Sequence, residues 1–153
     1  MENLVKVLLD KDLKIATAES CTGGLLAKKI TDVSGASRIF EMGLVAYANR
    51  IKEEFLGVPS EILNTKGAVS HETAEFMARG IARISKADIG VGITGIAGPT
   101  GGTPEKPVGL VYFGVHFNGE TIVKELRLSG NRDEIREQTT KEVEKVLLCL
   151  INN

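Results

Sequence analysis

The sequence predicts an α/β protein: a three-layer α/β/α fold with a mixed, mostly parallel sheet and a C-terminal β-hairpin. Three observations support this. Short apolar runs alternate with amphipathic helical segments along the chain. Asn118-Gly119, the strongest short hairpin signal, separates two apolar runs near the end. A length of 153 residues supplies one hydrophobic core, so we expect a single domain over residues 1–153.

The first half of the chain is predicted to contain two helix–strand pairs followed by two helices. Apolar residues at helical intervals predict a helix over 3–11, followed by a strand over 13–18 and a helix over 22–33. Residues 43–47 are typical of a buried strand. Two further helices are expected before residue 67. The first covers residues 50–56 with Asn49 as its N-cap, and the second is a short helical piece that begins at Ser60.

The second half adds one long helix, a strand, the hairpin and a final helix. Ser70 is the expected N-cap of a helix whose apolar face includes Met77 and Ile81. A strand over 88–94 contains glycines that permit close packing, and a glycine- and proline-rich loop over 95–107 follows it. The hairpin strands are expected over 108–117 and 121–128, and Asn131 is the expected cap of the last helix.

Composition excludes several classes of protein. The formal net charge is -1, aromatic residues make up 5% and Trp is absent, so nothing indicates a nucleic-acid partner. No apolar run is long enough to span a membrane. Two cysteines without a disulfide framework, and an N-terminus without a signal-peptide pattern, predict a cytoplasmic protein.

The segment Thr17-Ala18-Glu19-Ser20-Cys21-Thr22-Gly23-Gly24 joins a strand to a helix. Such a junction places a hydroxyl or thiol where backbone N–H groups and the helix dipole favour an anion. Ser20 is the candidate nucleophile, although it lies in neither a G-x-S-x-G nor an S-x-x-K motif. The alternative is that Ser20 only caps the helix. Cys21 is interpreted as buried packing, because nothing in the sequence supplies it with a histidine partner.

A tyrosine and a lysine form the second candidate group. Tyr47 closes a predicted strand, and Lys52 lies near the start of the next helix. A lysine half-buried beside a pocket has a lowered pKa and serves as a base, and a tyrosine hydroxyl between base and nucleophile relays a proton or holds the geometry. The alternative is a solvated Lys52 and a Tyr47 at the edge of the core.

Two further regions contain residue types that bind anions. In the loop from Thr94 through Gly95, Ala97 and Gly98, glycines let main-chain N–H groups approach a phosphate or carbonyl oxygen, although the loop matches no P-loop or dinucleotide fingerprint. Arg132, Arg136 and Gln138 lie at the start of the last helix, where cations oppose the helix dipole. A bland turn and a solvated helix face are the respective alternatives.

A metal site has little support. The two histidines, His71 and His116, share no ligand spacing, and we expect neither a metal nor a cofactor.

Five separated motifs, in order, resemble the C-terminal domain of the CinA (competence/damage-inducible protein) family. They are Thr17 to Gly24, Tyr47-x-Asn49-x-x-Lys52, Gly67-Ala68-Val69-Ser70, Gly95-Ile96-Ala97-Gly98-Pro99 and Lys106-Pro107-Val108-Gly109. The resemblance covers essentially the whole chain. Larger relatives carry an additional N-terminal domain that resembles molybdopterin-binding proteins, and we expect this chain to lack it.

The resemblance implies nicotinamide mononucleotide deamidase activity, an amidohydrolase reaction of pyridine nucleotide salvage that converts the carboxamide to the acid and releases ammonia. By motif, Ser20 corresponds to the nucleophile and Tyr47 and Lys52 to its partners. The implied substrate-binding residues are Thr22, Gly23, Gly24, Thr94, Gly95, Ala97, Gly98, Arg132 or Arg136, and Gln138. The expected partners are this small nucleotide and a second copy of the chain in a homodimer. The main alternative is a non-catalytic nucleotide- or phosphate-binding module, and a further one is a structural or assembly domain.

Overall fold

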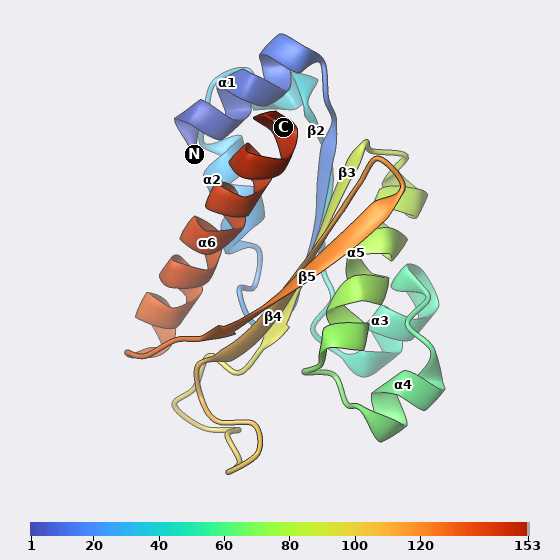
Figure 1. Ribbon diagram of the computed structural model, residues 1–153, viewed down its shortest axis with the longest axis vertical. Helices are drawn as coiled ribbons and strands as arrows, with labels where there is room; N and C mark the ends of the chain where they lie inside the picture. The colour runs from blue at the N-terminus through green and yellow to red at the C-terminus, as the bar shows by residue number, and fades with distance from the viewer. Residues whose placement is uncertain (153) are drawn as a thin grey trace.

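A five-stranded sheet separates two helical layers in the computed structural model, which describes residues 1–152 (Figure 1). The strand order is β2-β1-β3-β4-β5. β1 pairs in parallel with β2 and β3, whereas β4 is antiparallel to both β3 and β5. Only β4 therefore runs against the other strands, which confirms the mixed, mostly parallel sheet. The strands are β1 (Ile15–Glu19), β2 (Phe40–Val45), β3 (Ile89–Gly95), β4 (Leu110–Phe117) and β5 (Glu120–Arg127).

Helices cover both faces of this sheet, which confirms the three layers (Figure 1). One layer contains α1 (Glu2–Lys11), α2 (Leu25–Thr31) and α6 (Arg132–Asn152), and the other contains α3 (Asn49–Leu56), α4 (Ser60–Thr65) and α5 (His71–Ser85). A short 3-10 helix, η1 (Ala36–Arg38), precedes β2. The buried apolar residues form two clusters, one on each side of the sheet.

α5 packs unusually close to the sheet because glycines face it. A Cβ atom added at Gly90 would lie 2.2 Å from the carbonyl oxygen of Ala78, and one at Gly92 would lie 2.5 Å from the backbone nitrogen of Ala78. On β4, a Cβ at Gly114 would lie 2.7 Å from the carbonyl oxygen of Ala74. The prediction that the glycines of this strand permit close packing is confirmed.

The local signals at helix and strand ends are confirmed. The Ser70 hydroxyl accepts a hydrogen bond from the Thr73 N–H at 3.2 Å, as an N-cap does. Asn131 Oδ1 accepts from the Glu134 N–H at 3.0 Å, and Glu134 Oε2 accepts from the Asn131 N–H at 2.7 Å, which is a reciprocal capping box. Asn118-Gly119 has positive φ at both residues and connects β4 to β5.

Three expectations in the first half of the chain are corrected. The strand expected over 43–47 is β2, and it lies at the sheet edge with Met42 37% and Val45 49% exposed rather than buried. Its apolar composition does not reveal that β2 pairs with a neighbouring strand on one side only. Ala48, not Asn49, is the N-cap of α3. The helix expected over 22–33 is confined to α2, because Gly23 and Gly24 have positive φ and belong to the preceding turn.

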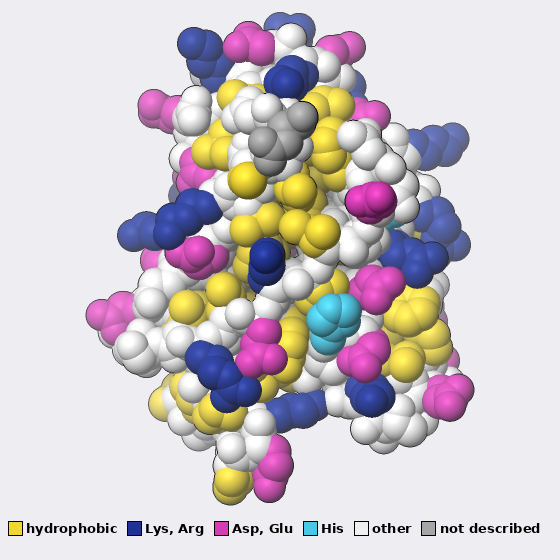
Figure 2. All heavy atoms as spheres, viewed as in Figure 1, with side chains coloured by type: hydrophobic (Ala, Val, Ile, Leu, Met, Phe, Trp, Pro, Cys, Tyr) yellow, Lys and Arg dark blue, Asp and Glu magenta, His cyan; other side chains and the backbone are white. Residues whose placement is uncertain are grey.

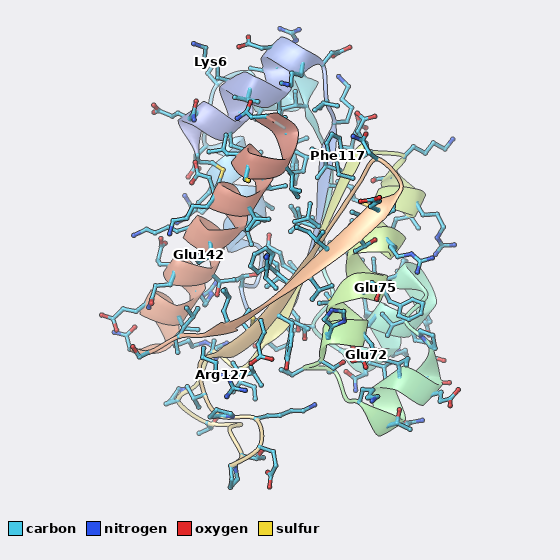
Figure 3. The ribbon with its side chains drawn as sticks, in the orientation of Figure 1. Lys6, Glu72, Glu75, Phe117, Arg127 and Glu142 are labelled. Carbon is cyan, nitrogen blue, oxygen red and sulfur yellow. The ribbon has the colours of Figure 1, made fainter. Side chains whose placement is uncertain are left out.

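The surface shows no dominant charge. Figure 2 shows Lys and Arg side chains interspersed with Asp and Glu over the face in view, in keeping with the net charge of -1. Within residues 1–152, no helix combines the length and the apolar composition needed to cross a bilayer. Figure 3 gives the orientation of the hairpin: Arg127 lies near the β3–β4 loop at one end, and Phe117 lies at the other.

Candidate active site

Three segments that leave parallel strands meet at one edge of the sheet. Ser20 follows β1, Tyr47 lies just beyond β2, and the glycine-rich loop begins at the end of β3. Together with the start of α6 they enclose a cavity of about 300 Å³. Ligands of open α/β sheets bind at this edge, beyond the carboxyl ends of the strands. The lining residues are Ser20, Cys21, Tyr47, Gly95, Ile96, Ala97, Gly98, Thr100, Gly101 and Arg132.

The turn that carries Ser20 is held by the buried carboxylate of Glu19. This side chain is 1% exposed and accepts hydrogen bonds from the N–H groups of Gly24 at 3.1 Å, Leu26 at 3.1 Å and Ala27 at 2.8 Å. The anion that sequence reasoning expects at this helix N-terminus is therefore supplied by the chain itself. The Ser20 side chain is left to face the cavity, because the Glu19 carboxylate caps α2 in its place.

Lys52, in the first turn of α3, lies behind the cavity lining and reaches the Ser20 hydroxyl from there. Its Nζ lies 3.2 Å from the Ser20 Oγ, 2.7 Å from the carbonyl oxygen of Ala46 and 3.2 Å from that of Tyr47. An ammonium donates one N–H to each of these three oxygens. When the ammonium loses a proton, the amine keeps two N–H donors for the two carbonyl groups and gains one lone pair that accepts from the Ser20 hydroxyl.

Burial favours that neutral form. Lys52 is 1% exposed, and desolvation lowers the pKa of its ammonium below the ordinary value of 10.5. Burial also raises the pKa of the neighbouring Cys21 thiol to about 12. Because Cys21 is then a neutral thiol at physiological pH, it gives Lys52 no counter-ion there. The predicted interpretation of Cys21 as buried packing agrees with its 7% exposure.

Tyr47 lies on the open side of the cavity, not between Lys52 and Ser20. Its side chain is 59% exposed, and its hydroxyl accepts a hydrogen bond from Arg132 at 3.0 Å. The same guanidinium donates to the carbonyl oxygen of Gly98 at 2.7 Å. Arg132 therefore connects the segment after β2 to the glycine-rich loop, and it places a cation at the cavity mouth.

The remaining sequence-derived candidates lie around the cavity rather than in its lining. Arg136 donates to the carbonyl oxygen of Thr22 through Nε at 3.1 Å and through a terminal nitrogen at 2.7 Å, which holds the Ser20 turn against α6. The buried Thr94 hydroxyl donates to the carbonyl oxygen of Ala68 at 2.6 Å. Gln138 donates to backbone carbonyl groups of Ser129 and Glu134, away from the cavity. Gly23 and Gly24 form the turn itself.

Sequence reasoning missed the role of Glu19. The available signal was a carboxylate at the last position of a buried strand, five residues before a helix without a Ser, Thr, Asp or Asn cap. It also left open which arginine reaches the site. The structure places Arg132 in the cavity lining and Arg136 behind the turn.

No group of three or more His, Cys, Asp or Glu side chains in the described part of the chain is arranged to hold a metal ion. The side chains at the site are instead a hydroxyl, a phenol and a guanidinium that line the cavity, and an amine that contacts the hydroxyl. Such a set suits acyl transfer by a serine together with recognition of an anion.

Comparison with known proteins identifies the family. Residues 1–151 match the model of the CinA C-terminal domain. The chain belongs to the CinA C-terminal domain family. It is 58% identical over 135 residues to a CinA-like protein of Kosmotoga olearia, which covers 88% of this chain and 33% of that protein. The chain spans about a third of the length of the curated relatives it matches.

Solved structures of CinA-related proteins share the fold. The competence/damage inducible protein CihA from Agrobacterium tumefaciens is 41% identical, with a TM-score of 0.93 over 99% of this chain and 95% of that one. A CinA superfamily protein from Klebsiella pneumoniae is 29% identical, with a TM-score of 0.95 over 99% of this chain and 94% of that one. The resemblance stated from the motifs is confirmed at the level of family and fold.

Proposed function

We propose that the chain is an amidohydrolase that deamidates nicotinamide mononucleotide to nicotinate mononucleotide and ammonia. The single observation that supports this most directly is the contact between the Ser20 hydroxyl and the buried Lys52 amine. A serine hydroxyl becomes an effective nucleophile when a base takes its proton, and lysine bases serve this role in unrelated folds. Membership of the CinA C-terminal domain family supports the choice of substrate.

The chemistry proceeds in two acyl-transfer steps. Lys52 accepts the Ser20 proton while Oγ attacks the carboxamide carbon, and the lysine proton is then delivered to the departing amine, which leaves as ammonia. Water next attacks the Ser20 ester with Lys52 again as base, which releases the carboxylate and restores the hydroxyl. The net reaction consumes one water for each amide bond broken.

The oxyanion formed in each step needs nearby N–H donors. Glu19 already accepts from the N–H groups of Gly24, Leu26 and Ala27. We therefore assign the oxyanion to the backbone nearer the hydroxyl, at Cys21 and Thr22, or to the facing Ala97–Gly98 segment of the cavity wall. Removal of one such donor typically lowers the rate about 10²–10³-fold.

The nucleotide phosphate is assigned to Arg132. Its guanidinium lines the cavity and is oriented by the Tyr47 hydroxyl and the Gly98 carbonyl oxygen. Arginine binds phosphate through paired N–H donors, so it provides both charge and orientation. In this arrangement Tyr47 orients the phosphate-binding arginine, and Lys52 accepts the Ser20 proton directly.

The test is release of ammonia from nicotinamide mononucleotide by the purified chain, with Ser20→Ala as the matched control. We expect steady turnover by the wild-type chain and almost none by the variant. A non-catalytic nucleotide-binding module instead predicts thermal stabilisation by the nucleotide without ammonia release. An assembly domain predicts neither. Full activity of Ser20→Ala would remove Ser20 from the mechanism.

The same proposal includes a homodimer located in the cytoplasm. Sedimentation velocity of the purified chain measures the assembly state directly. A species of one chain at all concentrations up to those of the activity assay would contradict the dimer.

A further inference from the structure

Two motifs singled out in the sequence, Gly67–Ser70 and Lys106–Gly109, meet in the structure although neither contains a residue assigned to the reaction. The first lies between α4 and α5, and the second ends the β3–β4 loop. Lys106 Nζ donates to the carbonyl oxygen of Lys66 at 2.5 Å and to that of Val69 at 2.7 Å. One lysine therefore joins the loop to the segment that precedes α5.

This loop forms one wall of the candidate active site. Its first part, from Gly95 to Gly101, lines the cavity opposite Ser20. Figure 1 shows the loop extending beyond the sheet, with few elements around it. Residues 99–105 are exposed, so apolar packing contributes little to holding them. Buried Ala97 and the backbone hydrogen bonds of Ile96 hold the start of the wall, so the part beyond Gly98 must depend on polar anchors.

The loop has one anchor at each end. Near its start, Arg132 donates to the carbonyl oxygen of Gly98 at 2.7 Å. Near its end, Lys106 makes the two contacts above, and its own N–H donates to the Thr103 hydroxyl at 3.0 Å, which closes the loop on itself. Among residues 99–107, all of which the structure describes, Lys106 is the one whose side chain bonds to another element.

The residues around the lysine fit this contact. Gly67 has a φ of 86°, and a Cβ atom added there would lie 3.1 Å from Lys106 Nζ. A side chain at this position would therefore crowd the ammonium as well as strain the turn. An ammonium donates in several directions from one point and suits two separate carbonyl groups, whereas a guanidinium presents a planar fork. The occurrence of glycine and lysine in the two motifs thus has one common explanation.

We infer that Lys106 is a positioning residue that holds Thr100 and Gly101, the exposed part of the cavity wall, in place for substrate by latching the β3–β4 loop to the segment before α5. The inference rests on the proposed deamidase function for its kinetic consequence. The latch itself is a property of the unliganded chain. Lys106 touches neither Ser20 nor Lys52, so its loss should weaken substrate binding more than it slows the chemical step.

The test compares Lys106→Met with Lys6→Met, which makes the same replacement at an exposed lysine on α1, far from the loop (Figure 3). For Lys106→Met we expect the KM for nicotinamide mononucleotide to rise about tenfold, the change that 1.4 kcal/mol produces, with kcat altered less than about threefold. The Tm should stay close to that of the wild type. Lys6→Met should match the wild type in all three quantities. A fall in kcat and Tm together at unchanged KM would indicate a merely structural role and overturn the inference.

Hydrogen exchange of the unliganded chain separates this inference from the proposed function. The Thr103 N–H, which donates to the carbonyl oxygen of Lys106 at 2.8 Å, should exchange faster in Lys106→Met than in the wild type or Lys6→Met, because the loop opens more often. Unchanged exchange would refute the latch even in an active enzyme. Faster exchange in a chain without deamidase activity would support the latch and refute the proposed function alone.

Discussion

Replacement of Lys52 by Met tests the central feature of the site, a buried amine whose pKa is lowered in the folded chain. Methionine matches the length of lysine but has no proton to donate or accept. It removes the base beside Ser20 and leaves the carbonyl groups of Ala46 and Tyr47 without their donor. The two effects are measured by different experiments, one kinetic and one thermodynamic.

The thermodynamic consequence follows from the lowered pKa of Lys52. In the unfolded chain this lysine titrates near its ordinary value of 10.5, and in the folded chain it titrates lower because of burial. Between the two values the unfolded chain binds the extra proton, so the free energy of unfolding rises with pH. The stability contributed by the neutral amine is complete above the unfolded pKa and is lost as the pH falls through the folded pKa.

The magnitude is bounded by one proton. Within that window the free energy of unfolding of the wild type should gain up to about 1.4 kcal/mol per pH unit over that of Lys52→Met. For a chain of this size the Tm difference should change by about 3–5 °C per pH unit. Other groups titrate alike in both proteins, so they cancel in the difference. Cys21 has a pKa of about 12 in the folded chain and an ordinary pKa of 9.0 in the unfolded chain; both proteins contain it, so the comparison subtracts its contribution.

The assay is urea unfolding of both proteins at one-unit steps from pH 6 to pH 10, with ammonia release measured over the same range. Turnover by the wild type should rise with pH as Lys52 loses its proton, and Lys52→Met should be about 10²–10⁴-fold slower. A stability difference that is constant across the whole range would show that Lys52 titrates alike in the folded and unfolded chains. The proposed base would then have no physical support.

Three other substitutions give independent tests. Ser20→Ala and Lys52→Met should each nearly abolish ammonia release. The double variant should be no slower than either single variant, because the two side chains act as a unit. Losses that add up in the double variant would show that the two side chains act separately. Glu19→Gln replaces one carboxylate oxygen, a hydrogen-bond acceptor, by an NH2 donor that faces backbone N–H groups. We expect the free energy of unfolding, measured by calorimetry, to fall by about 1–3 kcal/mol. A wild-type Tm would contradict the role of Glu19 in holding the turn. Gly80→Ala would place a Cβ 2.1 Å from the carbonyl oxygen of Leu56, so α3 must move. We expect the free energy of unfolding to fall by about 1–3 kcal/mol and turnover to fall with it. Wild-type stability together with wild-type turnover would refute the close contact.

Short-range signals predicted the fold well. Ser70, Asn131 and Asn118-Gly119 act through neighbours within three or four residues, so their sequence context contains almost all of the interaction. The alternation of strands and helices likewise indicated the three layers. The misplaced features depend on distant residues. β2 is apolar in composition, yet its exposure is set by the number of strands beside it.

The candidate site was predictable only in part, for the same reason. The sequence indicated that segments after two strands converge, because the parallel arrangement brings their ends together. It could not show that the Lys52 amine is enclosed, since burial depends on α3 packing against α5 through Gly80. Nor could it separate Arg132 from Arg136, which are one helical turn apart and differ only in what each guanidinium meets.

Three charged side chains around the cavity share one mode of action: each makes hydrogen bonds to the backbone of another segment. Glu19 accepts from N–H groups at the start of α2, Arg136 donates to the Thr22 carbonyl oxygen, and Lys106 donates to two carbonyl groups before α5. Charge-assisted hydrogen bonds of this kind are about twice as strong as neutral ones, and they fix backbone that apolar packing does not reach. A serine nucleophile needs its partners within a few tenths of an ångström, yet it must remain open to substrate. Hydrogen bonds of this type provide both precise position and access to substrate. They hold the Ser20 turn and the β3–β4 loop from the side that faces away from the cavity, so the cavity side stays open. The charged residues around the cavity therefore belong to two groups, those that meet the substrate and those that hold the backbone around it.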